Sequence, residues 1–106
     1  MPTSQPDAPR VTDNRDLERY EVHLGDELAG FVTYRLRPDR ITFLHTEVEP
    51  ALEGRGIGSL LAAAALDDAR ARGLSVIPIC PFISSWIKRH PEYGDLVLAW
   101  PPTVEE

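Results

Sequence analysis

The fold of this 106-residue chain is decided at one stretch, Glu53-Gly54-Arg55-Gly56-Ile57-Gly58-Ser59-Leu60-Leu61. Its three glycines at alternating positions allow positive φ angles and a close approach of the backbone to a ligand. The apolar residues that follow recur at helical spacing, and Gly73 stands where the residue after a helix is often glycine. The stretch therefore predicts a glycine-rich turn that opens a helix over residues 56–72. The apolar stripe of that helix is Ile57, Leu60, Leu61, Ala64, Ala65 and Ala69.

Before this stretch the sequence alternates between polar and apolar residues, which is typical of half-buried strands. The predicted strands cover residues 19–24, 28–36 and 41–48. Gly25-Asp26-Glu27 joins the first two as a β-hairpin, and Pro50 ends the third.

After the helix, residues 74–79 read as a short buried strand. Pro78 interrupts its pairing, because proline has no N–H to donate. Pro81 opens a second helix over residues 82–89, Pro91 ends it, and residues 96–98 are expected to add a last strand. The strands on either side of the long helix form a βαβ unit with parallel strands, so the sequence predicts an α/β fold with a mixed sheet.

Length and composition limit the number of domains and the kinds of partner that the chain is expected to have. The length suits one domain, expected over residues 15–98, with a Pro-rich disordered tail at residues 1–14 and a loose tail at residues 99–106. A net charge of −6 without a basic cluster argues against nucleic acid as a partner. No apolar run reaches the roughly 20 residues of a membrane-spanning helix. With Cys80 as its one cysteine, the chain has no thiolate cluster for zinc and is expected in the cytoplasm without a metal.

The glycine-rich stretch has more than one interpretation. The free N–H groups and the dipole of a helix N-terminus favour a phosphate group. A tight turn that serves packing alone explains the same glycines. A nucleotide-binding P-loop is excluded because Gly58-Ser59 lacks the lysine, and a dinucleotide fold needs a longer chain.

Several motifs together point to a family. Val48-Glu49-Pro50, followed by residues 53–61, resembles the coenzyme-A-binding segment of the GNAT superfamily of N-acetyltransferases. The run of residues 45–48, His-Thr-Glu-Val, and Cys80-Pro81 at the start of the last helix resemble a minimal, single-domain subfamily of about this length. The resemblance extends over roughly residues 18–97.

The resemblance implies a mixed sheet whose two central parallel strands splay apart to admit acetyl-CoA as co-substrate. The residues implied in coenzyme binding are Val48, Arg55, Gly56, Ile57, Gly58 and Ser59, with the pyrophosphate on backbone amides. Glu53 departs from the family pattern, which has Gln or Arg there, so the backbone and Arg55 are expected to hold the phosphates. The implied acceptor is a primary amine, small or carried by a protein, that attacks directly in a ternary complex.

Three residues are candidates for catalysis. Cys80, at a helix N-terminus, is either a nucleophile or positioning group beside the thioester, or a small core residue. His45 and Glu47 share one strand face, where either one is able to accept a proton from an amine; the alternative is a solvated pair. Trp86 occupies the place where many relatives carry a tyrosine acid, and it is expected to pack. Tyr93 or Cys80 is then left as the proton donor.

Two functions remain open on the sequence. The first is an N-acetyltransferase, and the second is a module that binds coenzyme A or acetyl-CoA without efficient catalysis. A purely structural domain explains fewer of the motifs. The chain is expected as a monomer or a homodimer that contacts neither nucleic acid nor membrane.

Overall fold

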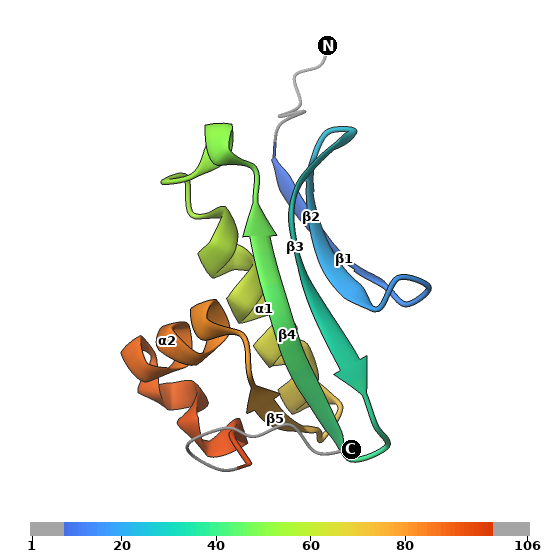
Figure 1. The fold of residues 1–106 in the computed structure, drawn as a ribbon, viewed down its shortest axis with the longest axis vertical. Coiled ribbons are helices and arrows are strands. Elements are labelled where there is room, and N and C mark those ends of the chain that lie inside the picture. Colours follow the sequence, from blue (N-terminus) through green and yellow to red (C-terminus); the bar gives the residue numbers. More distant parts are fainter. Residues whose placement is uncertain (1–7, 99–106) are drawn as a thin grey trace.

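One five-stranded sheet forms the centre of the protein, and the computed structural model describes it within residues 8–98 (Figure 1). The strands lie side by side in sequence order. They are β1 (Pro9–Asn14), β2 (Arg19–Leu24), β3 (Glu27–Leu36), β4 (Arg40–Val48) and β5 (Ser75–Pro78). The first four pair antiparallel, and β5 runs parallel to β4. The predicted mixed sheet is thus confirmed, and β5 ends at Pro78, where the pairing was expected to stop.

Two α-helices pack against this sheet, and both were predicted. They are α1 (Ile57–Ala71) and α2 (Pro81–Arg89), accompanied by two short 3₁₀ helices, η1 (Pro50–Leu52) and η2 (Pro91–Leu96). Figure 1 shows α1 behind β4 and α2 beside it. Within residues 8–98, no helix is long and apolar enough to cross a membrane.

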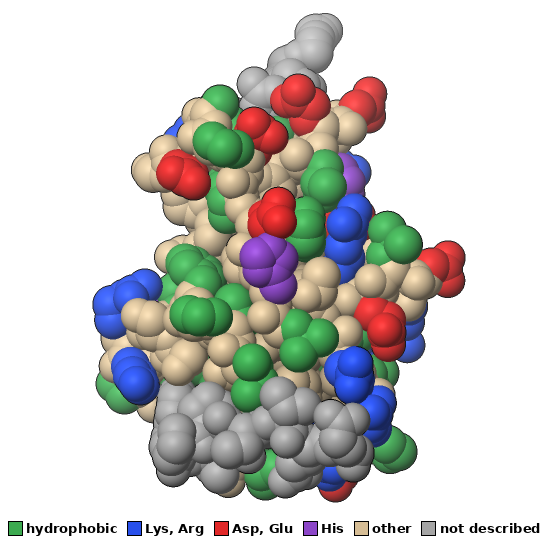
Figure 2. Space-filling model, in the orientation of Figure 1, with side chains coloured by type: hydrophobic (Ala, Val, Ile, Leu, Met, Phe, Trp, Pro, Cys, Tyr) green, Lys and Arg blue, Asp and Glu red, His purple; other side chains and the backbone are tan. Residues whose placement is uncertain are grey.

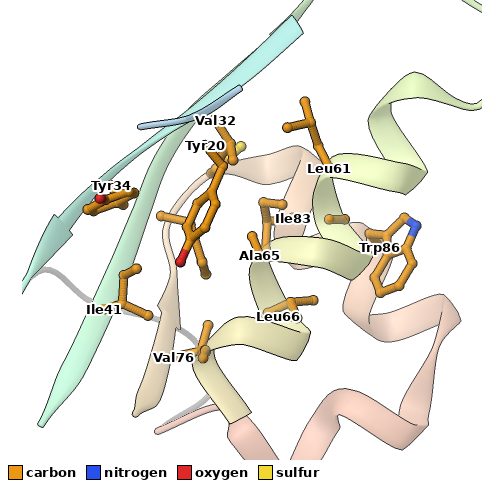
Figure 3. Packing of buried hydrophobic residues seen from close by; sticks show 14 of the residues in the cluster. Tyr20, Val32, Tyr34, Ile41, Leu61, Ala65, Leu66, Val76, Ile83 and Trp86 are labelled. Carbon is orange, nitrogen blue, oxygen red and sulfur yellow. The ribbon is translucent and has the colours of Figure 1, made fainter. Parts of the chain in front are cut away.

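The core lies between one face of the sheet and α1. Figure 3 shows Tyr20 and Ile41 of the sheet directed toward Leu61 and Ala65 of the helix. Burial and a hydrogen bond from its hydroxyl to Asp68 raise the pKa of Tyr20 well above its ordinary value. Asp68 also accepts a hydrogen bond from Arg72, one turn later on α1, at 3.2 Å. These contacts attach α1 to the sheet at the end of the helix away from the glycine-rich turn.

The N-terminal prediction needs a correction. Residues 9–14 were expected to belong to a disordered tail, but they form β1, paired with β2 from Pro9↔Leu24 to Asn14↔Arg19. Two contacts explain the order: Val11 packs on the core, and Asp13 accepts a hydrogen bond from the Tyr34 hydroxyl at 2.6 Å. The proline-rich composition concealed a strand whose stability depends on contacts with distant residues. The rest of that tail, residues 1–7, and the predicted tail at residues 99–106 lie outside the described residues.

The predicted last strand is also wrong. The chain after α2 forms η2, and what remains of a strand is a single bridge between Val76 and Val97. Arg70 of α1 explains the 3₁₀ turn, since its guanidinium donates to Asp95 at 3.0 Å and to the Glu92 carbonyl at 2.9 Å. These hydrogen bonds hold residues 91–96 against α1, so the segment does not extend the sheet.

Candidate functional site

The two parallel strands separate halfway along β4. Pairing with β5 runs from Arg40↔Ser75 to Phe43↔Pro78, whereas β4 continues to Val48. Leu44 is an extra residue of β4, because the register with β3 shifts between Thr33 and Tyr34. The open edge of β4 beyond this bulge is the gap that the family resemblance implied.

The backbone of Thr46 and Val48 faces this gap. Beyond the bulge, the Glu49 N–H donates to the Ala29 carbonyl at 2.8 Å, so Glu47 and Glu49 direct their backbone groups toward β3. Because backbone direction alternates along a strand, the N–H and C=O of Thr46 and Val48 point the other way. The splay thus directs the backbone groups of two residues of β4 toward the gap.

The N-terminus of α1 is bare. Its N-cap is Gly56, in the left-handed conformation at φ 79°, and no side chain caps the helix. The first helical hydrogen bond runs from Leu60 N–H to Gly56 C=O at 3.0 Å, so the amides of residues 57–59 have no partner within the helix. Gly54, at φ 88°, also adopts a conformation that other residues avoid. The first turn contains no acidic residue, which leaves the helix dipole uncompensated at this end.

A cavity of about 390 Å³ joins the bare helix end to the open edge of β4. Its lining consists of Thr46, Val48, Leu52, Glu53, Gly54, Gly56, Ile57, Gly58, Ser59 and Phe82. Five of the six residues expected to bind the coenzyme belong to this lining. The sixth, Arg55, is exposed and does not line the cavity.

The chemistry of the lining fits a pyrophosphate group that carries a partly apolar arm. Unpaired amides at a helix N-terminus suit phosphate oxygens, and Val48, Ile57 and Phe82 offer an apolar wall. Glu53 is the exception, since its carboxylate adds a negative charge where phosphates are expected. Among residues 8–98, no three metal-ligating side chains come together.

Cys80 lies on the cavity side of β4. The residue is 2 % exposed, and its Sγ is 3.1 Å from Thr46 Oγ1. The Cys80 N–H donates to the Phe43 carbonyl at 2.9 Å. This bond attaches the start of α2 to the last residue of β4 that pairs with β5. Cys80 is also the N-cap of α2, as its position before Pro81 suggested.

His45 and Glu47 lie on the opposite face of β4. Their side chains are 59 % and 61 % exposed, and His45 Nε2 is 2.9 Å from Glu47 Oε2. Because side chains alternate along a strand, Thr46 and Cys80 share the helix-covered face while this pair occupies the other. The structure therefore brings His45 and Glu47 together and separates both side chains from the Cys80 thiol.

The sequence reasoning overlooked Thr46 and Phe82. Thr46 stands between the two candidate bases, where period-two alternation alone directs it toward the gap. The Phe82 ring faces Gly58 so closely that a Cβ there would lie 2.7 Å from it. Phe82 follows Pro81 directly, and helical spacing was not enough to show which face of α2 meets α1.

The two aromatic residues at the end of the described chain, Trp86 and Tyr93, both contact α1. Trp86 is 4 % exposed, as expected of a packing residue. The Tyr93 hydroxyl donates to Asp67 at 2.8 Å, a hydrogen bond that raises the pKa of Tyr93. Asp67 lies ten residues along α1 from Ile57, roughly 15 Å at 1.5 Å per residue. The Tyr93 hydroxyl is thus directed away from the gap and is not placed to act as a proton donor there.

Comparison with known sequences agrees with this geometry. A sequence model of the family described as GCN5-related N-acetyl-transferase matches residues 19–96. The chain belongs to this family. It is also 36 % identical over 84 residues to Protein NATD1 of Mus musculus, an alignment that covers 77 % of this chain and 76 % of the mouse protein.

Solved structures share the fold. A GCN5-like N-acetyltransferase from Staphylococcus aureus superposes with a TM-score of 0.66 and 22 % identity, over 91 % of this chain and 92 % of that one. Ribosomal-protein-alanine N-acetyltransferase from Brucella melitensis gives a TM-score of 0.56 and 19 % identity, over 83 % and 66 %. Since members of the family use acetyl-CoA, the chain is an acyltransferase of the GNAT type, with the fold class inferred from its sequence.

Proposed function

We propose that this protein transfers an acetyl group from acetyl-CoA to a primary amine by direct attack within a ternary complex. One observation carries the proposal: the bare N-terminus of α1 and the open edge of β4 line the same cavity. The first feature suits a pyrophosphate and the second suits an amide-containing arm that ends in a thioester. Acetyl-CoA supplies the activated acetyl group, and approximation of the two substrates lowers much of the barrier.

The proposed binding residues act mainly through their backbone. The amides of Ile57, Gly58 and Ser59 bind the phosphate oxygens, and Arg55 adds a positive charge from outside the cavity. The outward-facing N–H groups of Thr46 and Val48 bind the arm and polarise the thioester carbonyl. The amides of residues 57–59 are held in position by the helix backbone, so phosphate binding through them does not need the Gln or Arg side chain that Glu53 replaces.

The proposed proton acceptor is the pair of His45 and Glu47. Glu47 takes the proton of the attacking amine, directly or through a water molecule, and His45 Nε2 lies 2.9 Å from Glu47 Oε2, close enough to orient it. Acidic side chains predominate at the upper end of this face in Figure 2, where the β2–β3 turn and η1 lie. Such a surface attracts a cationic acceptor, an effect that salt weakens.

Calorimetric titration with acetyl-CoA and with CoA tests the binding half of the proposal. Gly56→Val and Gly73→Val make a matched pair, because both glycines have positive φ, at 79° and 69°, and neither Cβ would meet a neighbour within 4 Å. We expect Gly56→Val to weaken binding by roughly a hundredfold or more, equivalent to about 2.7 kcal/mol, and Gly73→Val to leave it unchanged. Folded Gly56→Val that binds as tightly as the wild type would exclude the loop as the phosphate site.

An acceptor screen, followed by release of the CoA thiol, tests the catalytic half. The panel contains small diamines and polyamines, amino sugars and lysine-containing peptides. The second candidate function, a coenzyme-A-binding module, is favoured by Trp86, because its indole cannot supply the proton that a tyrosine provides in many relatives. Tight binding without turnover on any amine in the panel would support that candidate.

A further inference from the structure

Trp86 makes a polar contact that packing does not require. Its Nε1–H donates to Ser59 Oγ at 3.1 Å, and Ser59 belongs to the first turn of α1 and lines the cavity. Figure 3 shows the indole ring lying against α1, on the side away from the sheet. A buried residue of α2 therefore contacts the segment assigned above to the pyrophosphate.

The direction of this hydrogen bond fixes the role of the serine hydroxyl. An indole N–H donates and never accepts, so Ser59 Oγ is the acceptor. The hydroxyl retains one hydrogen to donate, and among the described residues its one side-chain hydrogen bond is the one it accepts from Trp86. A phosphate oxygen in the cavity is an acceptor of the required kind, and hydrogen bonds to charged groups are the stronger ones.

Two aromatic rings pack against the indole and hold it in place. The His90 ring stacks on it with centroids 3.8 Å apart and planes at 15°, and Tyr93 contacts it at 5.3 Å. One turn earlier on α2, Phe82 meets Gly58 so closely that a side chain there would clash. These contacts hold α2 against the first turn of α1, so the Trp86 N–H keeps its position relative to Ser59.

We propose that Trp86 is a positioning residue that orients the Ser59 hydroxyl as a donor to the pyrophosphate of the coenzyme. This inference rests on the proposed function and adds a side-chain donor to the backbone amides. It gives a role to the residue that stands where many relatives carry a tyrosine acid. That role is in binding and does not involve proton transfer.

A double-mutant cycle with Ser59→Ala and Trp86→Phe tests the proposal, with calorimetric affinity for CoA as the readout. We expect each single variant to bind CoA about tenfold more weakly, as for the loss of one hydrogen bond to a charged group. The double variant should then bind no more weakly than Ser59→Ala, because Trp86 acts through the serine. Ser59→Thr should restore the affinity, and Ser85→Ala, an exposed serine of α2, should not alter it.

A second ligand separates positioning from packing. S-acetylpantetheine carries the thioester arm without the pyrophosphate, so its affinity should be the same in all four proteins of the cycle. Where Trp86→Phe is poorly folded, benzothienylalanine at position 86 keeps the ring shape and replaces the N–H by sulfur. Additive losses in the cycle, an equal loss for S-acetylpantetheine, or unchanged CoA affinity in Ser59→Ala would overturn the proposal. If the wild type binds no CoA at all, the proposed function itself is at fault.

Discussion

The helix-free face of the sheet carries two histidine–glutamate pairs that look alike in sequence and differ in structure. Glu21 and His23 on β2 are two residues apart, as are His45 and Glu47 on β4. The register places Glu21 and Glu47 on either side of Phe31, so both carboxylates occupy the same face. The ring of Phe31 lies 6.4 Å from the His45 ring and under the Arg19 guanidinium at 4.4 Å.

The difference between the pairs is the number of partners. Glu21 is buried and accepts hydrogen bonds from Arg19 at 2.7 Å and from Asn14 at 2.9 Å, while His23 is 3.6 Å away. Burial opposes ionisation of Glu21, but the donors outweigh it and lower its pKa. Glu47 is exposed, with His45 at 2.9 Å. A carboxylate bound by an arginine is a poor proton acceptor, so the comparison gives Glu21 a structural role and supports Glu47 as the proposed base.

The largest expected effect is on turnover. We expect Glu47→Gln to slow acetyl transfer by roughly a hundredfold or more, because the loss of a general base has effects of that size. Affinity for acetyl-CoA should be unchanged, because the side chain lies on the face opposite the cavity. The measurement is the rate of thiol release with the amine found in the screen.

Glu21→Gln is the matched control, since it removes the same charge from the same face. Its turnover per folded molecule should equal that of the wild type. Loss of activity in Glu21→Gln together with wild-type turnover in Glu47→Gln would reverse the assignment. His45→Gln belongs to the same series. It should reduce the rate less than Glu47→Gln, because the proposed role of His45 is to orient the Glu47 carboxylate and not to accept the proton.

The next effect is on stability, where Glu21→Gln is expected to have the larger effect of the two variants. Glu21→Gln should lower the free energy of unfolding by about 1–3 kcal/mol, because it breaks buried hydrogen bonds to a charged group. Glu47→Gln should change it by less than about 0.5 kcal/mol, as is usual for exposed positions. Urea unfolding followed by circular dichroism measures both. Equal values for the two variants would mean that burial of Glu21 has no energetic consequence.

A smaller effect is the pH dependence of stability. The pKa of Glu21 is lower in the folded protein, so its contribution is present above the ordinary glutamate pKa of about 4.3 and is lost as the pH falls through the folded value. We expect the wild type to lose stability below that pH more steeply than Glu21→Gln. Asp95, whose pKa Arg70 lowers in the same direction, remains in both proteins and cancels in the difference.

The sequence predicted most of the fold because its strongest signals are local. The helical stripe after Gly56, the alternation in β2 to β4 and the prolines at positions 78 and 81 each act within a few residues. β1 and η2 could not be predicted, because their order depends on partners far along the chain. Asp13 is held by Tyr34, and residues 91–96 are held by Arg70.

The candidate site was predicted to a similar extent and for a related reason. Glycine spacing located the bare helix end, and the pairing of His45 with Glu47 follows from their spacing on one strand. The same spacing occurs at Glu21 and His23, and nothing in the local sequence distinguishes the two pairs. The distinction requires Arg19 and Asn14 in their folded positions. Similarly, the contact between Trp86 and Ser59 joins residues 27 apart and carries no local signal.

The smallest expected effect concerns Cys80. Its role separates two mechanisms, one in which the acetyl group is first transferred to Cys80 on the cavity side of β4, and one in which the amine attacks the thioester directly with Glu47 as the base. A thiol at a helix N-terminus is able to attack a thioester, and an acetyl group would then pass from the coenzyme sulfur to Sγ and from there to the amine. The Cys80 thiol is buried beside Thr46, however, and Glu47 lies across the strand, so we expect direct attack by the amine. Cys80→Ala should then retain activity within about tenfold, since proximity supplies much of the rate. Intact mass spectrometry after mixing with acetyl-CoA alone provides the check. Rapid stoichiometric acetylation of Cys80 that is discharged by the amine would instead assign the first step to the cavity side.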